Sequence, residues 1–267
     1  MTPLRVERAL PAPAPARGYD AVQSVERAFQ LFELLVQHRS LKLGALADAV
    51  GVHKSTAFRL LQTLMKLGYV EKEPGGGAYQ LGLKAIETGA RALRSWPVHE
   101  AARPVMDGLA AALGETVNLA LVDGLEMVYV VTVDTENALR MQLNVGRRAP
   151  VHCTAVGKAV LAFRPDVFAR LEGRPLARLT ERTLTDPAAL AAHLAEVRRL
   201  GYAVDDEEQE IGARCVAAPV RDAGGRVIGA LGVSAPAARL DTERIREIGP
   251  DLVRAATLIS TRLGWCE

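Results

Sequence analysis

The chain has 267 residues, of which 49% are hydrophobic, and its net charge is only +2. This length favours two domains, and we expect no membrane-spanning helix because no run of about 18 uncharged apolar residues occurs. Three cysteines and five scattered histidines form neither a disulfide framework nor a metal-ligand pattern, so we expect a cytoplasmic protein without a metal or other cofactor.

The N-terminal segment, residues 1–20, differs in composition from the rest of the chain. It holds four prolines among alanines and arginines and lacks the apolar centre of a signal peptide, so we predict a disordered tail. Residues 1–72 carry ten Lys or Arg against six Asp or Glu. The excess of basic residues in this N-terminal part suggests a polyanionic partner, although charges can also be distributed unevenly over an ordinary solvated surface.

Residues 21–82 predict a helical domain that ends in a hairpin. A first helix is expected from Ala21, with Ser24 as its cap. Its expected buried face consists of Val22, Val25, Phe29, Phe32 and Val36. A short second helix should end at Gly51, because glycine commonly terminates helices. The apolar residues of this second helix are Leu43, Leu46, Ala47 and Val50.

A third helix begins near His53 and ends at Gly68. Its expected buried stripe consists of Ala57, Leu60, Leu61, Leu64 and Leu67. Two short strands, 69–72 and 78–81, follow it with a glycine-rich turn between them. Three short helices and a hairpin in this order are typical of a winged helix-turn-helix, in which the second helix of the pair enters the DNA major groove.

The polar face of the third helix is the predicted DNA-binding surface. The candidate DNA contacts are Lys54, Ser55, Thr56, Arg59 and Gln62. Arg59 suits a base edge because its guanidinium matches the acceptors of guanine, whereas Ser55 and Thr56 suit phosphate. The alternative is an ordinary solvated face, and the helix-turn-helix order favours DNA.

Residues 83–97 predict a linker helix that stops at Pro97, because proline disfavours a helical conformation in the residue before it. Residues 98–267 predict one larger domain. Its expected helices are 99–113, 154–163, 186–200 and 241–263, and its expected strands are 117–122, 126–133, 139–144, 213–220 and 226–234. Since strands and helices do not alternate regularly, the fold class is α+β with a mostly antiparallel sheet.

Two features of the larger domain invite an enzymatic interpretation. Gly157-Lys158 matches only part of a phosphate-binding loop, since neither the residue after the lysine nor the one five before the glycine fits that motif. Cys153 and His152 do not make a ready nucleophile pair, because adjacent residues of an extended chain point to opposite sides.

The helix start at Ala155 and Val156 offers free backbone N–H groups that can bind a carboxylate, unless it is a plain helix start.

Many short motifs follow one another in a characteristic order from residue 21 to the C-terminus. In the first domain they are Ser24-Val25-Glu26-Arg27-Ala28, Leu46-Ala47, residues 54–61, Gly68-Tyr69-Val70 and Tyr79-Gln80-Leu81-Gly82. In the larger domain they are Gly146, Pro150, residues 154–159, Gly201-Tyr202, Asp206-Glu207-Glu208, Gly212, residues 215–220 and Val233-Ser234. Together these motifs resemble the IclR family of bacterial transcriptional regulators.

The resemblance implies a winged helix-turn-helix domain, a linker helix and a GAF-like effector-binding domain. Members of the family usually act as dimers or tetramers and bind palindromic operators near genes for carbon-compound catabolism. Their typical effectors are small carboxylates, including aromatic acids. The expected partners of this chain are therefore double-stranded DNA, further copies of the chain and a small carboxylate, and no membrane. Repression is the expected mode of control, although the sequence leaves open both activation as the alternative and whether the effector releases or recruits the protein.

The resemblance also implies an effector site in the larger domain. The candidate effector-binding residues are Met141, Leu143, Ala155, Val156, Asp205, Cys215 and Ser234. The alternatives are a solvated acidic run for Asp205 and plain core for Cys215, Met141 and Leu143. Some family members carry a serine where this chain has Gly232. We therefore expect extra room and one hydroxyl fewer there, which favours a ring-bearing or branched acid.

Two other functions compete with a regulator. An enzyme with an accessory DNA-binding domain is disfavoured because the sequence has no metal cluster, nucleophile elbow or cofactor fingerprint. A purely architectural DNA-binding protein is disfavoured by the size of the second domain. We expect a transcriptional regulator, not an enzyme, whose operator binding is modulated by a small organic acid.

Overall fold

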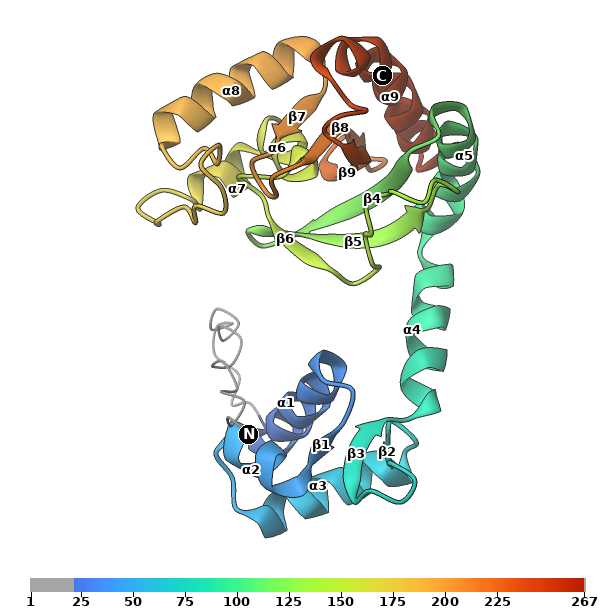
Figure 1. Ribbon diagram of the computed structural model, residues 1–267, viewed down its shortest axis with the longest axis vertical. Coiled ribbons are helices and arrows are strands. Elements are labelled where there is room, and N and C mark those ends of the chain that lie inside the picture. The colour runs from blue at the N-terminus through green and yellow to red at the C-terminus, as the bar shows by residue number, and fades with distance from the viewer. Residues whose placement is uncertain (1–21, 267) are drawn as a thin grey trace. The chain divides into compact units, whose positions relative to one another are not determined.

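The computed structural model describes residues 22–266, so the predicted tail at residues 1–20 lies outside the described residues. The chain divides into two compact units, and the division follows Ala92, inside helix α4 (Leu83–Ser95) (Figure 1). Each unit has its own hydrophobic core. Over residues 22–266, no helix combines the length and the apolarity that crossing a membrane requires.

The N-terminal unit combines helices with a three-stranded antiparallel sheet in the order β1-β3-β2. Before α4 its elements are α1 (Gln23–Gln37), β1 (Leu41–Lys42), α2 (Leu43–Val50), α3 (Lys54–Lys66), β2 (Val70–Lys72) and β3 (Ala78–Leu81). Gly51 ends α2 with a φ of 69°, a left-handed conformation that costs glycine little. Only Gly51, Val52 and His53 separate α2 from α3, so the predicted helix-turn-helix order is confirmed.

The buried face of α1 differs from the predicted one. Leu31 and Leu35 enter the core, whereas four of the five predicted residues are largely exposed, namely Val22, Val25, Phe29 and Val36. Leu67, predicted to belong to the buried stripe of α3, is also exposed. Ser24 does not cap α1, since no side chain caps this helix. The prediction failed because α1 carries apolar residues on two faces, and periodicity alone does not show which face packs inward.

The C-terminal unit is an antiparallel sheet flanked by helices. After α4 its elements are α5 (Pro97–Leu113), β4 (Thr116–Asp123), β5 (Glu126–Val133), β6 (Arg148–Pro150), α6 (Ala155–Leu161), α7 (Pro165–Ala169), α8 (Pro187–Leu200), β7 (Ala203–Asp206), β8 (Ala213–Arg221), β9 (Val227–Pro236) and α9 (Thr242–Arg262). The sheet order is β6-β5-β4-β9-β8-β7, and every neighbouring pair is antiparallel. The predicted α+β class is therefore confirmed.

The six-stranded sheet separates two hydrophobic cores. Helices α5 and α9 pack on one face of the sheet, and α6 and α8 pack on the other (Figure 1). Since successive side chains of a strand point to opposite faces, every long strand contributes to both cores. The face beneath α6 carries most of the polar residues discussed below.

The predicted strand at residues 139–144 is wrong, because residues 134–147 form a loop. The free edge of β5 is taken instead by β6, in which Arg148 pairs with Val128 and Pro150 with Glu126. The loop is held by side chains near the start of β4. Thr116 Oγ1 donates a hydrogen bond to the Met141 carbonyl at 3.1 Å.

Candidate DNA-binding and effector-binding sites

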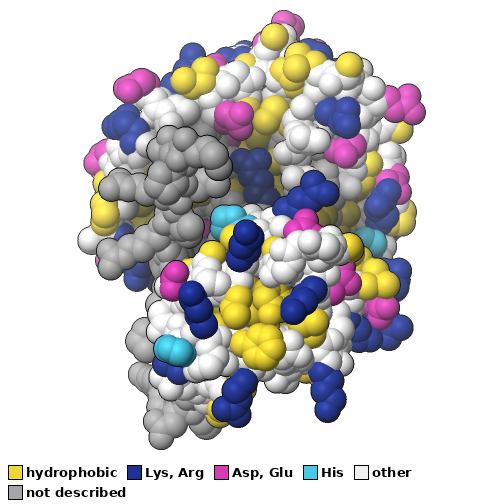
Figure 2. Space-filling view, turned by 60° about the horizontal axis from the view of Figure 1, so that its bottom comes forward, with side chains coloured by type: hydrophobic (Ala, Val, Ile, Leu, Met, Phe, Trp, Pro, Cys, Tyr) yellow, Lys and Arg dark blue, Asp and Glu magenta, His cyan; other side chains and the backbone are white. Residues whose placement is uncertain are grey.

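Helix α3 presents the predicted DNA contacts of the N-terminal unit. Lys54, Ser55, Arg59 and Gln62 are exposed and Thr56 is half-buried. His53 Nδ1 lies 3.0 Å from Ser55 Oγ, so these two side chains interact at the start of the helix. Figure 2 shows Lys and Arg side chains around a patch of hydrophobic side chains on this unit. An exposed basic face of this kind is suited to phosphate.

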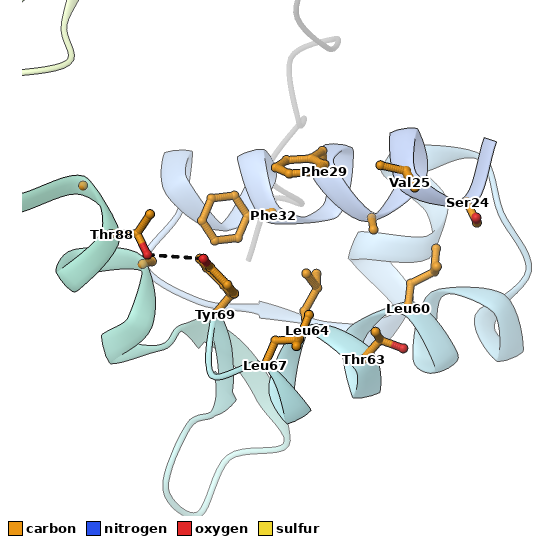
Figure 3. Close-up of a pocket in the computed structure, with 13 residues that line it drawn as sticks. Ser24, Val25, Phe29, Phe32, Leu60, Thr63, Leu64, Leu67, Tyr69 and Thr88 are labelled. Atoms are coloured by element: carbon orange, nitrogen blue, oxygen red, sulfur yellow. Dashed lines mark hydrogen bonds between the residues drawn. The ribbon is translucent and has the colours of Figure 1, made fainter. Parts of the chain in front are cut away.

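A second surface of the N-terminal unit is an apolar groove of about 800 Å³ between α1, α3 and α4 (Figure 3). Its lining residues are Ser24, Val25, Ala28, Phe29, Phe32, Leu60, Thr63, Leu64, Leu67, Tyr69, Ala85, Thr88 and Gly89. Phe29 is 62% exposed at the edge of the groove, and Tyr69 Oη lies 3.3 Å from Thr88 Oγ1. An exposed apolar surface of this size marks an interaction site. We call it the α1/α4 groove.

In the C-terminal unit, strand register aligns polar residues in a row beneath α6. Asp205 pairs with Cys215, Cys215 with Ser234, and Ser234 with Thr116, so the row crosses four strands. We call these four residues the polar row. Three of its members are predicted effector-binding residues from distant parts of the sequence, and the sheet brings them together.

Asp205 is the most perturbed group of the polar row. It is only 2% exposed, and burial raises the pKa of its carboxyl to about 7 despite the opposing charge of Lys158. Its Oδ1 accepts hydrogen bonds from the backbone N–H groups of Glu208 at 2.8 Å and Gln209 at 3.4 Å. The expected alternative of a solvated acid is therefore wrong for Asp205. A carboxyl with this pKa can donate or accept a hydrogen bond near neutral pH.

Cys215 keeps accessible surface, although burial raises the pKa of its thiol to about 12. The Sγ of such a cysteine is a neutral thiol, not a nucleophile. Burial also raises the pKa of Cys153 to about 12. His152 Nε2 lies 3.0 Å from the Ala177 carbonyl oxygen. The imidazole is therefore engaged with this carbonyl and does not form a catalytic pair with Cys153.

Helix α6 begins over small residues of the sheet such as Gly232, next to the polar row. Thr154 caps the helix, since its Oγ1 accepts a hydrogen bond from the Gly157 N–H at 3.1 Å. Ala155 and Val156 are buried, and their backbone N–H groups have no hydrogen-bond acceptor among the described residues. Buried N–H groups without an acceptor are costly, so the start of α6 favours an anion or a water.

The expected extra room at Gly232 is wrong. A Cβ at this position would lie 2.8 Å from Asn118 Oδ1 and 3.1 Å from Val156 Cγ1, so the space is already filled. Asn118 Nδ2 donates to Ser234 Oγ at 3.0 Å, and Asn118 Oδ1 has no partner among the described residues. Asn118 thus adds a polar side chain at the place where the sequence predicted one hydroxyl fewer. The signal for this residue in the sequence is that Asn118 is the only polar residue between Val117 and Val122.

A buried ion pair that the sequence did not predict lies next to this site. Lys158 of α6 is fully buried and its Nζ contacts Glu208 Oε1, while Glu208 Oε2 has no partner among the described residues. Glu208 follows β7 only three residues after Asp205. The lysine of the Gly157-Lys158 dipeptide therefore joins α6 to the end of β7 and does not bind phosphate.

The remaining predicted residues lie at the edge of the same site. Leu143 belongs to the core cluster that contains Ala155 and Val156. Met141 is half-buried, and its carbonyl is bound by Thr116 of the polar row. The structure therefore brings six of the seven predicted effector-binding residues to the face of the sheet that α6 covers, and Met141 lies in the loop beside it.

Two known domains account for nearly all of the described chain. Residues 24–74 match the IclR helix-turn-helix domain, and residues 90–261 match the domain described as bacterial transcriptional regulator IclR C-terminal. The chain belongs to the IclR family. It is a DNA-binding transcriptional regulator with an effector-binding C-terminal domain, and not an enzyme.

Similar proteins cover this IclR-family regulator over almost its whole length. The HTH-type transcriptional regulator KdgR of Escherichia coli is 40% identical over 92% of this chain and 94% of that protein. The crystal structure of Thermotoga maritima IclR has a TM-score of 0.76 at 30% identity and covers 92% of this chain and 100% of that one. An IclR homolog from Microbacterium hydrocarbonoxydans, complexed with 4-hydroxybenzoate, has a TM-score of 0.79 at 27% identity and covers 90% and 98%.

Proposed function

We propose that this IclR-family regulator acts in the cytoplasm as a dimer or tetramer that represses a catabolic operon, and that a small organic acid bound between α6 and the sheet modulates its affinity for a palindromic operator. The observation that carries the proposal is the convergence of Asp205, Cys215 and Ser234 with the unpaired N–H groups of Ala155 and Val156. Hydrogen-bonding groups that converge on one buried place are the usual sign of a ligand site.

The DNA-binding half of the proposal rests on α3. Its exposed polar residues, Lys54, Ser55, Arg59 and Gln62, occupy the helix that enters the major groove in helix-turn-helix proteins. One such helix covers one half-site, so a palindromic operator requires two copies of the chain. Repression is supported by relatives such as the transcriptional repressor IclR of Escherichia coli, which is 33% identical to this chain.

The α1/α4 groove supplies a surface for the second copy. Leu83 and Ile86 of α4 are 66% and 67% exposed, and Phe29 of α1 is exposed beside the groove. A soluble monomer rarely leaves so many large apolar side chains in water. Pairing of this surface with its own copy would bury them and would present two α3 helices to one operator.

The effector half of the proposal rests on the polar row. A carboxylate at the start of α6 would accept hydrogen bonds from the buried N–H groups of Ala155 and Val156. A hydroxyl or keto group of the same ligand would meet Asp205 and Ser234. The 4-hydroxybenzoate bound by the Microbacterium homolog supports an aromatic acid as one candidate.

The test begins with operator selection from a random DNA pool by the full-length protein. Fluorescence anisotropy of the selected operator is then measured with 4-hydroxybenzoate, pyruvate, succinate and gluconate. At least one acid should shift operator affinity, because an effector must bind the DNA-competent and incompetent states differently. Calorimetry should show that Asp205→Asn weakens binding of that acid by about tenfold, the range of one hydrogen bond to a charged group.

Asp206→Asn is the matched control, since Asp206 points to the other side of β7 and pairs with Arg182 and Arg214 on the surface. This variant should bind the acid as the wild-type protein does. The proposed effector site is wrong if the active acid binds Asp205→Asn with unchanged affinity, and the proposed function is wrong if no acid shifts operator affinity.

A further inference from the structure

The edge of the sheet formed by β5 and β6 carries an arginine that the function above does not use. Arg147 immediately precedes β6, and two backbone hydrogen bonds with Tyr129 of β5, one made by Arg147 and one by Gly146, attach this segment to the sheet. The Tyr129 N–H donates to the Arg147 carbonyl at 3.0 Å, and the Gly146 N–H donates to the Tyr129 carbonyl at 2.8 Å. The backbone of Arg147 therefore has a defined place beside Tyr129.

The neighbouring arginine shows which way Arg147 faces. Arg148 Nη2 and Nε bind Asp123 and Glu126 at 2.5 and 2.7 Å on the surface. Ala149, the next residue, belongs to the core beneath α6. Since side chains alternate along an extended chain, Arg147 lies on the side of Ala149 and opposite to Arg148. Arg147 thus faces the side of the sheet that α6 covers.

Arg147 is half-buried, and its guanidinium forms no hydrogen bond or ion pair with the part of the chain that the structure describes. This is unusual for a partly desolvated cation, which normally pairs with a carboxylate or a carbonyl group. The adjacent Arg148, on the opposite side, has two carboxylate partners. A missing protein partner for Arg147 leaves its five donors free for a ligand.

Tyr129 offers a second unpaired group at the same place. The residue is 4% exposed and packs in the same core cluster as Ala155 and Val156, yet its hydroxyl has no hydrogen bond to any described residue. Burial is the main cause that raises the pKa of Tyr129, Cys215 adds to it, and the charge of Arg147 opposes it. The Tyr129 side chain therefore lies on the face of the sheet that also carries the polar row.

The strand register places Tyr129 near the start of α6. Tyr129 of β5 pairs with Ala120 of β4. Asn118, two residues away on the same face of β4, pairs with Gly232, and a Cβ at Gly232 would lie 3.1 Å from Val156 Cγ1. The charge of Arg147 opposes the rise in the pKa of both Tyr129 and Cys215, in agreement with a position on this face of the sheet.

We infer that Arg147 and Tyr129 form a second recognition pole of the effector site, and that the effector is a dicarboxylate. One carboxylate occupies the place beneath α6 that the proposed function assigns, and the other pairs with the Arg147 guanidinium and accepts a hydrogen bond from the Tyr129 hydroxyl. This inference rests on the proposed function and narrows its ligand class.

The charges of the site favour a second acid over a neutral end group. Lys158 already pairs with Glu208, so neither neutralises Arg147. Asp205 is the remaining acid of the floor, and burial keeps its pKa near 7, which leaves it only partly ionised at neutral pH. A partly buried guanidinium gains more from a carboxylate, which it can bind with two hydrogen bonds, than from a hydroxyl or a methyl group.

The test compares diacids with monoacids of equal chain length. Calorimetry at constant ionic strength on the full-length protein measures succinate against butyrate, glutarate against valerate, and adipate against hexanoate. At least one diacid should bind about tenfold or more tightly than its monoacid. Arg147→Met should reduce this ratio to near one while leaving monoacid affinity unchanged, and Tyr129→Phe should weaken the diacid about threefold to tenfold.

Arg148→Met is the matched control, because it removes the adjacent arginine, whose guanidinium faces the surface, and it should keep the diacid preference. Tyr129→Phe retains the buried ring and so tests the pole even if Arg147→Met folds poorly. The dicarboxylate inference is overturned if monoacids or gluconate bind as tightly as every diacid, or if Arg147→Met keeps the preference. In those cases the proposed function survives, whereas it fails together with the inference if no acid binds or shifts operator affinity.

Discussion

Asp205 shows how one side chain can combine burial with hydrogen bonding. Two backbone N–H groups favour its ionised form, and burial with the nearby Glu208 opposes it more strongly. The result is a carboxyl whose pKa is raised from 3.8 to about 7. Such a group makes the stability of the protein depend on pH.

We expect Asp205 to make the folded state less stable as pH rises from about 4 to about 7. Over this range the folded chain retains a proton that the unfolded chain has lost, so the free energy of unfolding falls with increasing pH. Asp205→Asn keeps an oxygen for the N–H groups of Glu208 and Gln209 but cannot ionise. The stability of the variant relative to wild type should therefore increase between about pH 4 and about pH 7 in urea unfolding.

The comparison with wild type isolates Asp205 from other titrating groups. His193 has a pKa lowered to about 4, mainly by burial, so its own contribution to stability rises with pH and acts in the opposite direction. Both proteins carry His193, and its contribution cancels in the difference. A difference in stability that stays flat or falls with pH would contradict the raised pKa of Asp205.

Arg59 is the residue-scale prediction for DNA. Its exposed guanidinium on α3 should form two hydrogen bonds with a guanine, so Arg59→Ala should weaken operator binding by about 1–3 kcal/mol and relax specificity at one base pair per half-site. Fluorescence anisotropy on the selected operator and on single-base variants measures both effects. Arg103→Ala, an equally charged surface change on α5, should alter neither, and equal binding by Arg59→Ala and wild type would show that Arg59 does not contact a base.

At the scale of elements, α6 is held tightly against its surroundings. A Cβ on Gly157 would lie 2.2 Å from the Val151 carbonyl oxygen, so this position requires glycine for close backbone packing. The next residue, Lys158, extends into the interior and pairs with Glu208 after β7. These contacts connect the start of α6 to the segment that follows Asp205, and so join the two halves of the proposed effector site.

Breaking the buried pair should therefore cost much stability. Lys158→Met leaves Glu208 buried without its cation and should destabilise the C-terminal unit by about 3–5 kcal/mol. Lys158→Met combined with Glu208→Met should be less destabilised than the single variant, because no unpaired charge remains. Urea unfolding measures both, and additive losses in the double variant would mean that the two side chains do not depend on each other.

At the scale of the whole molecule, the N-terminal unit leaves large apolar side chains in contact with water. Val25, Phe29 and Val36 of α1 are exposed among polar neighbours, and α4 has no buried residue. Folding alone does not remove this surface from water, and the proposed association of two copies would do so. In that proposal, dimerisation and recognition of a two-fold operator have one physical cause.

Phe29→Glu should separate the copies without unfolding the unit, because Phe29 is 62% exposed. A charge within the proposed apolar interface should weaken dimerisation at least tenfold, roughly the loss of one interface hot spot, and should weaken operator binding with it. Sedimentation velocity measures the first effect and anisotropy the second. Leu139→Glu, at a residue of the C-terminal unit that is 68% exposed, is the control that should leave both unchanged. Dimers of normal strength in Phe29→Glu would exclude the α1/α4 groove as the interface.

The amino-acid sequence by itself determined the order and the type of most elements, although the short elements β1, β6, α7 and β7 were not predicted. Local signals suffice for this, since glycines such as Gly51 and Gly114 end helices and aspartates such as Asp186 cap them within a few residues of the positions they define. The same signals distinguished the helix-turn-helix from the antiparallel domain. The predicted DNA contacts on α3 remain predictions, as do the roles of the effector-binding residues.

Only the tertiary structure decided which apolar face of α1 enters the core, that residues 139–144 form no strand, and that Asn118 fills the space beside Gly232. It also placed Lys158 against Glu208 and Arg147 beside Tyr129. Each of these depends on partners far away in the sequence. Periodicity records how a residue faces within its own element, whereas strand register and helix packing decide what it meets there.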